Sequence, residues 1–239
     1  MSENKSPAVV RFSEAKATHT AQMMKINDIA TAIARSKKER DAAIEHGREA
    51  ETNWRTRFRS LRGAMTPELR AEHSQRIASR ELAEEFTGLI EELEFEHEGE
   101  TINAVRTGHA YVNAHNTAFT QYAESQWDAA MRNVSPTLIR AIRLKLLSLR
   151  LNDRSRHTDP LHEEPEVILA REVGKLLADK AEGAQLDMKA EPVLSEIGIY
   201  RPALTGVDMR LYNSQAAIHK LVYERKEKHD RKQQKESQA

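Results

Sequence analysis

The chain has 239 residues and no cysteine, and its 37 basic and 37 acidic side chains cancel to a formal net charge of zero. A neutral balance argues against a protein whose main task is gripping nucleic acid, because phosphate contacts call for an excess of positive charge. The missing cysteines exclude a disulfide framework and favour a reducing cytoplasm or a virus particle assembled there. No stretch has the apolar character of a signal peptide or a membrane span, so we expect a soluble protein.

The abundance of Glu, Lys, Arg, Gln, Ala and Leu predicts an all-α fold, since all six favour helices. Residues 1–12 are expected to be a flexible lead. From about residue 13 to residue 62, apolar side chains recur in steps of three and four, the pattern of a coiled-coil seam. The predicted seam residues are Ile26, Ile33, Ile44, Trp54, Phe58 and Leu61. The middle of this seam is poor, because charged residues and Gly47 fall in the same register.

A stop signal at Gly63 separates the first helix from a second. Thr66 is a plausible N-cap and Pro67 suits the first helical position. The second helix is expected to reach about His97 and to end at Gly99, because glycine is the usual residue after a helix C-terminus. Two long helices joined by a short turn predict an antiparallel coiled-coil hairpin. With a third helix over about 100–132, the hairpin makes up a region of 13–132.

The C-terminal helical region, 133–229, reads as several shorter helices. Pro136 opens a strongly apolar helix, residues 152–165 read as a polar loop, and residues 166–181 as an amphipathic helix. A single turn begins at Pro192, and a last helix covers about 207–229. Residues 230–239 are expected to be a charged tail.

No catalytic or metal motif stands out along the chain. The His97-Glu98 and His162-Glu163 pairs lack the second histidine of H-E-x-x-H, and the glutamates of 91–98 are interpreted as a solvated helix end. His109 is interpreted as a core or interface histidine held by a hydrogen bond, the alternative being a pH-sensitive contact. The arginines of 55–62 and 140–156 suit a solvated surface, a protein contact or, least of all, nucleic acid. We therefore predict a binding protein, not an enzyme, with no metal and no cofactor.

The segment 194–202, LSEIGIYRP, resembles the L-x-x-I-G, aromatic, R-P element of the phage polarity-suppression (Psu) family. As in that family, an acidic-x-Arg step follows at Asp208 to Arg210, and the last helix carries Tyr223 and Arg225. The resemblance implies an intertwined homodimer encoded by a phage or phage satellite. It further implies binding to the hexameric bacterial termination factor Rho, suppression of Rho-dependent termination, and decoration of a capsid. The implied location is the host cytoplasm and the capsid exterior.

The same C-terminal segment has a physical reason to form a contact site. Gly198 and Pro202 should fix a loop that presents Tyr200 and Arg201, residue types common at interface hot spots. The plain alternative is a loop that docks the last helix on its own core. The proposed partner-binding residues are Tyr200, Arg201, Asp208, Arg210, Tyr223 and Arg225.

Two further expectations concern the whole chain. The long apolar seam of the first helix, together with the apolar face of 138–146, predicts a homodimer. A purely structural capsid decoration or scaffolding protein is the alternative function, because a neutral helical hairpin suits it equally well.

Overall fold

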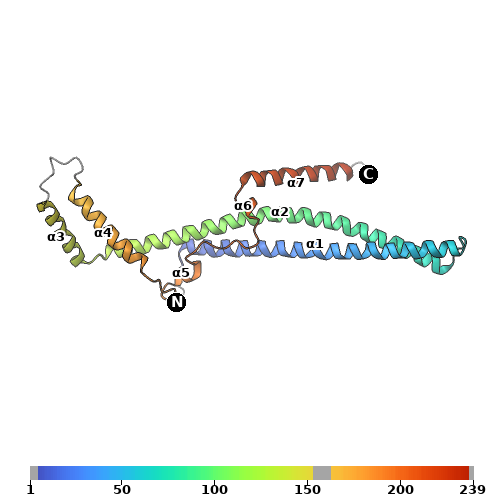
Figure 1. Ribbon diagram of the computed structural model, residues 1–239, viewed down its shortest axis with the longest axis horizontal. Helices are drawn as coiled ribbons and strands as arrows, with labels where there is room; N and C mark the ends of the chain where they lie inside the picture. The colour runs from blue at the N-terminus through green and yellow to red at the C-terminus, as the bar shows by residue number, and fades with distance from the viewer. Residues whose placement is uncertain (1–4, 153–162, 237–239) are drawn as a thin grey trace. The chain divides into compact units, whose positions relative to one another are not determined.

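The computed structural model describes residues 5–152 and 163–236, and within these ranges every regular element is a helix, which confirms the all-α prediction. The chain divides into two compact units. One contains residues 10–114 and 202–239, and the other contains residues 1–9 and 115–201. The helices are α1 (Pro7–Ser60), α2 (Pro67–Arg132), α3 (Pro136–Asn152), α4 (Pro165–Glu182), α5 (Pro192–Ile197), α6 (Met209–Tyr212) and α7 (Gln215–Glu236) (Figure 1).

Helix starts follow the proline signals closely, because proline at the first helical position loses no hydrogen bond there. The starts of α1 to α5 all fall on a proline. At the start of α2 the Leu69 amide donates to Thr66 Oγ1 at 3.3 Å, which confirms the predicted cap. The preceding turn uses Gly63 at a φ of 85°, and its amide donates to the Phe58 carbonyl at 2.9 Å.

In the larger unit, α1 and α2 form a hairpin (Figure 1). The buried positions of this hairpin repeat every seven residues. On α1 these positions are Phe12, His19 and Ile26 in one row, and Ile29, Ser36, Ala43 and Ala50 in a second. On α2 they include Leu69, Ala83, Ile90 and Ala104. Rows of this period are the coiled-coil pattern. In the middle of the seam, the two helices therefore pack through small side chains. This explains why the sequence has few large apolar residues there.

The predicted seam residues are buried to different degrees. Ile26 is buried, and Ile33, Trp54 and Phe58 are half-buried, but Ile44 and Leu61 remain 46% and 41% exposed. Trp54 stacks on Phe58 with ring centroids 5.1 Å apart, and the Arg76 guanidinium of α2 lies 4.7 Å from the Trp54 ring. The hairpin thus covers the well-formed ends of the seam within a single chain.

Several helix boundaries differ from the sequence expectation. Helix α1 begins at Pro7, inside the supposed lead of 1–12, because Val9 and Phe12 are buried and make this segment part of a packed helix. Helix α2 continues through Gly99 to Arg132, so the separate helix over 100–132 does not exist. The last helix is divided into α6 and α7, and α7 extends through most of the supposed tail to Glu236.

In the smaller unit, α3 and α4 lie antiparallel, joined by Lys145–Glu172 at 3.2 Å and an Arg150–Glu166 ion pair. The predicted loop between them lies mostly outside the described residues. Helix α5 buries Leu194 and Ile197 and ends at Gly198, whose φ of 81° confirms the expected positive-φ glycine. The His115 ring Nε2 lies 3.2 Å from the Gly198 carbonyl oxygen, which accepts the hydrogen bond.

Candidate functional site

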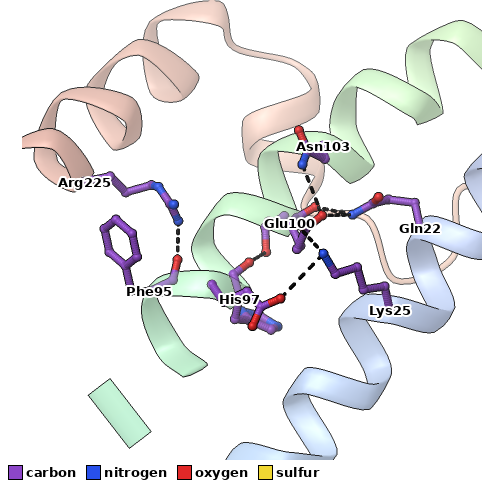
Figure 2. A network of polar contacts seen from close by, with 9 residues as sticks. Gln22, Lys25, Phe95, His97, Glu100, Asn103 and Arg225 are labelled. Atoms are coloured by element: carbon purple, nitrogen blue, oxygen red, sulfur yellow. Dashed lines mark hydrogen bonds and ion pairs between the residues drawn. The ribbon is translucent and has the colours of Figure 1, made fainter. Parts of the chain in front are cut away.

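A network of polar side chains joins α1 to α2 around Glu100 (Figure 2). The Glu100 carboxylate accepts hydrogen bonds from Lys25 Nζ at 2.7 Å, Gln22 Nε2 at 2.6 Å and Asn103 Nδ2 at 3.1 Å. Gln22 also donates to the Glu100 carbonyl oxygen at 3.1 Å, so one side chain fixes both the backbone and the carboxylate. The Glu100 side chain is only 15% exposed.

This arrangement changes the acidity of Glu100. The hydrogen bonds from Lys25, Gln22 and Asn103, in that order of effect, lower the pKa of Glu100 from its ordinary 4.5 to about 2. Hydrogen bonds to an ionised carboxylate favour the charged form, and they outweigh the cost of its partial burial. The carboxylate therefore stays ionised at any pH near neutrality and acts as a fixed link between α1 and α2.

On the other side of α2, Arg225 of α7 lies over the helix at Gly99 (Figure 2). A Cβ atom at Gly99 would come within 2.8 to 3.0 Å of the guanidinium group. That guanidinium donates to the Phe95 carbonyl oxygen, and its central carbon lies 4.1 Å from the Phe95 ring centroid. Gly99 is therefore not a helix stop: it leaves room for an arginine to reach the backbone of α2.

Beyond Arg225, α7 continues along α2 through charged pairs. Lys228 contacts Glu98 at 2.6 Å and Lys232 contacts Glu92 at 3.0 Å. From α1, Lys37 contacts Glu94 at 2.6 Å. The acidic run of α2 is thus not a solvated helix end, since α1 and α7 supply lysines to it from different sides.

An open groove of about 710 Å³ lies between α2 and α7 along this run. It is lined by glutamates of α2, by Phe95 and by basic residues of α7 such as Lys228 and Arg231. His229 stacks beside Phe95 with ring centroids 6.2 Å apart. The groove is chemically suited to hold charged side chains.

The N-terminal end of α7 packs into a small apolar core. Ile102 and Val105 of α2 pack with Val207, Leu211, Tyr212 and Ile218. His109 stacks on Tyr212 with centroids 3.8 Å apart, and its Nε2 lies 3.1 Å from the Tyr212 carbonyl oxygen, which accepts the hydrogen bond. This geometry matches the interpretation of His109 as a histidine satisfied by a hydrogen bond, although its side chain lies at the surface.

The six proposed partner-binding residues belong to two different units of the structure. Tyr200, which is 85% exposed, and Arg201 belong to the smaller unit, while the other four belong to the larger one. Asp208 caps α6, accepting hydrogen bonds from the Arg210 and Leu211 amides at 2.8 and 3.3 Å. Arg210 is exposed and Tyr223 is 64% exposed. Arg225 is the one that the structure places at a junction.

The sequence did not predict that Gln22, Lys25, Gly99 and Glu100 lie at the contacts of α2 with α1 and α7. A signal was available for Gly99, because the seven-residue spacing of Leu69, Ala83, Ile90 and Ala104 keeps the same register on both sides of it. A helix stop should interrupt such a repeat. No comparable signal marks Gln22 or Glu100, whose pairing depends on the register of α1 against α2.

This chain is similar to proteins of phage P4. The chain is 29% identical to Glycoprotein 3 of Enterobacteria phage P4 over 212 residues, which cover 88% of this chain and 86% of that protein. It also resembles a chain in the solved structure of the satellite phage P4 procapsid including size determination (Sid) protein. That likeness has a TM-score of 0.79 and 27% identity, and it covers 95% of this chain and 96% of the other. No protein-family model matches the chain.

These likenesses extend over nearly the whole chain, so they include both units and not only the C-terminal segment that carries the resemblance to the polarity-suppression family. Over residues 5–152 and 163–236, no group of three or more His, Asp or Glu side chains is arranged to hold a metal ion. No helix in that part of the chain is long and apolar enough to cross a membrane.

Proposed function

We propose that this chain is a satellite-phage assembly protein that acts by binding, associating with itself and with the coat of a procapsid, and thereby influencing capsid size. The observation that carries the proposal is the likeness to the P4 procapsid chain over 95% of this sequence at a TM-score of 0.79. Agreement at that level over nearly the full length supports a shared architecture and not a shared motif.

The helices suit such a role physically. At 1.5 Å per residue, α2 is about 100 Å long, roughly three times the diameter of a small domain. A helix of that length needs continuous lateral support, which the seven-residue seam and the Glu100 network provide within the chain. A stiff element of this length offers an extended surface for contacts with other proteins.

The test is co-expression with the coat protein of the procapsid in which the relative occurs, followed by purification of particles and electron microscopy. The chain should co-purify with the particles and change their diameter distribution relative to coat protein expressed alone. Particles of unchanged size that carry none of the chain would contradict the proposal.

A second candidate function is inhibition of Rho, implied by the resemblance to the polarity-suppression family. The observation that favours it is Tyr200, which is 85% exposed next to an exposed arginine, Arg201. An exposed tyrosine offers a contact surface to a protein partner, and tyrosine and arginine are both common at interface hot spots.

This second function is tested by Tyr200→Ala combined with Arg201→Ala, with folding checked by circular dichroism. Truncation of a hot spot costs about 2 kcal/mol, so inhibition of Rho ATPase should weaken about thirtyfold. If the unaltered protein leaves Rho unaffected, the Rho hypothesis fails and the capsid proposal is untouched.

A further inference from the structure

Helix α7 consists of two parts that are held in different ways. In the inner part, Ile218 is buried in the core that α6 and α7 form with α2, and Leu221 packs against that core. Beyond Arg225 every residue of 226–234 is exposed except Glu227, which is half-buried. We call residues 226–234 the arm of α7. Because the arm buries no apolar side chain, polar contacts hold it on α2.

Arg225 fixes the point from which the arm extends. Its guanidinium group donates to the Phe95 carbonyl oxygen, and its central carbon lies 4.1 Å from the Phe95 ring centroid (Figure 2). The Arg225 residue is half-buried, and salt screens a partly buried contact less than a contact between exposed charges. The helix is therefore held firmly at Arg225 and more weakly beyond it.

Two ion pairs among the described residues join the arm to α2. In the Lys232–Glu92 pair, at 3.0 Å, the two side chains are 56% and 63% exposed. In the Lys228–Glu98 pair, at 2.6 Å, the lysine side chain is 59% exposed. Exposed ion pairs add little to stability, and salt weakens them further. The contacts of the arm are thus both weak and sensitive to ionic strength.

The charges on the two facing surfaces have opposite signs. Residues 81–105 of α2 contain glutamates and no lysine or arginine. The acidic residues of the arm do not face this surface: Glu227 pairs with Arg231 within α7 at 3.6 Å, and Asp230 is two positions from each of the two paired lysines. Two positions along a helix correspond to its opposite side. The attraction between the arm and α2 is therefore electrostatic and is greatest at low ionic strength.

The closed position of the arm has a cost at Glu98. One oxygen of the Glu98 carboxylate, Oε2, is buried and has no hydrogen-bond partner among the described residues. A buried polar atom without a partner has lost its hydrogen bonds to water, which is unfavourable. Because Glu98 lines the groove and contacts Lys228, opening of the arm brings water to this carboxylate. This cost partly offsets the attraction that keeps the arm closed.

We propose that the arm of α7 is a conformational switch that lies on α2 at low ionic strength and opens at high ionic strength. Arg225 and the inner part of α7 stay in place in both states. Local openings of this kind involve the least stable contacts of a structure. The open arm uncovers Phe95 and Glu98, so the surface of α2 that other molecules meet differs between the two states. The proposal does not depend on the role in capsid assembly.

The first experiment measures hydrogen exchange of the full chain in about 0.05 M and about 0.5 M sodium chloride, between which the screening length falls severalfold. Protection of the amides of 226–234 should fall about fivefold, the factor that a pair of weak ion pairs supplies. Protection of residues 102–112 and 215–221 should stay unchanged. Equal protection of the arm at both salt concentrations, or a parallel loss in residues 102–112, would overturn the proposal.

A charge reversal tests the same opening without added salt. Lys232→Glu places a negative charge opposite Glu92 and should lower the protection of 226–234 about fivefold at low salt. Lys226→Glu is the matched control, because it makes the same charge change at an exposed residue of the arm that does not line the groove. The control should keep most of its protection. An equal loss in both variants would contradict the proposal.

A double variant separates the ion pair from effects within α7 itself. A glutamate near the C-terminal end of a helix is unfavourable by its charge alone, whatever lies opposite. Glu92→Lys changes α2 only, so combining it with Lys232→Glu should restore protection of the arm only if the two side chains attract each other across the groove. A double variant as unprotected as Lys232→Glu alone would overturn the proposal.

Discussion

At the scale of single residues, what a side chain does in this protein depends on which helix lies over it. Gly88 and Gly99 are both in the middle of α2, yet a Cβ atom added at Gly88 would meet nothing within 4 Å, while Arg225 occupies that space at Gly99. The first glycine only weakens the helix, and the second admits a contact between α2 and α7.

The two glycines make a matched pair of variants. Gly88→Ala should raise the free energy of unfolding by about 0.5–1 kcal/mol, the ordinary gain of alanine over glycine in a helix. Gly99→Ala should have the same helix gain but displace the Arg225 guanidinium, so α7 should lose protection in hydrogen exchange. Equal protection of residues 220–232 in both variants would show that Arg225 does not hold α7.

Glu100 should make stability depend on pH in the acid range. Its pKa falls from 4.5 to about 2 on folding, so its contribution is fully present above pH 4.5 and is lost as the pH falls towards 2. Glu100→Gln should lower the free energy of unfolding by about 1–2 kcal/mol at pH 7. This value allows for the screening of the Lys25–Glu100 pair by solvent, because Lys25 is half-exposed.

The measurement for Glu100 is urea unfolding of both proteins from pH 7 to pH 2. The gap between the two unfolding free energies should narrow below pH 4.5 and nearly close near pH 2. A gap that is constant with pH would mean that the loss comes from packing and not from the charge.

At the scale of elements, the hairpin is closed by its small residues. Ala43 is buried in the seam, whereas the neighbouring Ile44, the more apolar residue, is 46% exposed. Ile44 lies outside the seam because the register of α1 is set by a row of buried residues with a seven-residue spacing. These residues are Ile29, Ser36, Ala43 and Ala50. Close approach of two helices at small residues leaves no space for a larger one.

This register predicts that a charge at Ala43 destabilises the protein more than a charge at the more apolar Ile44. Ala43→Glu should destabilise the hairpin by about 3 kcal/mol or more, because it buries an unpaired carboxylate in a tight seam. Ile44→Glu should change stability by less than about 1 kcal/mol, as surface substitutions usually do. Thermal melts followed by circular dichroism compare the two, and a larger loss for Ile44→Glu would mean that the register is wrong.

At the scale of the whole molecule, the apolar surface expected to mediate self-association is different from the one that the sequence suggested. The sequence predicts a homodimer largely from the seam of α1, but α2 covers much of that seam within the same chain. Exposed leucines are present on α3, which has no buried residue.

We expect the full chain to be a dimer or a larger oligomer at low micromolar concentration, measured by light scattering. The physical reason is that burying the leucines of α3 recovers about 25 cal/mol for each Å² removed from water. A stable monomer under those conditions would contradict the proposed self-association.

The sequence by itself determined the helical class, the helix starts at Pro67, Pro136 and Pro192, the turn at Gly63 and the positive-φ turn at Gly198. These are local matters, set by capping, missing amides and glycine conformations within a few residues. It also determined the antiparallel hairpin, because a short turn between two long amphipathic helices leaves little choice.

Only the tertiary structure decided that α2 runs unbroken through Gly99, that α1 starts at Pro7, and that Glu100 and Arg225 tie three helices together. Gly99 has the composition signal of a stop, but a glycine continues a helix where packing on both sides outweighs its low propensity. Lys25 lies 75 positions from its partner Glu100, and Phe95 lies 130 positions from its partner Arg225. Such pairings depend on the register between helices, which no local pattern contains.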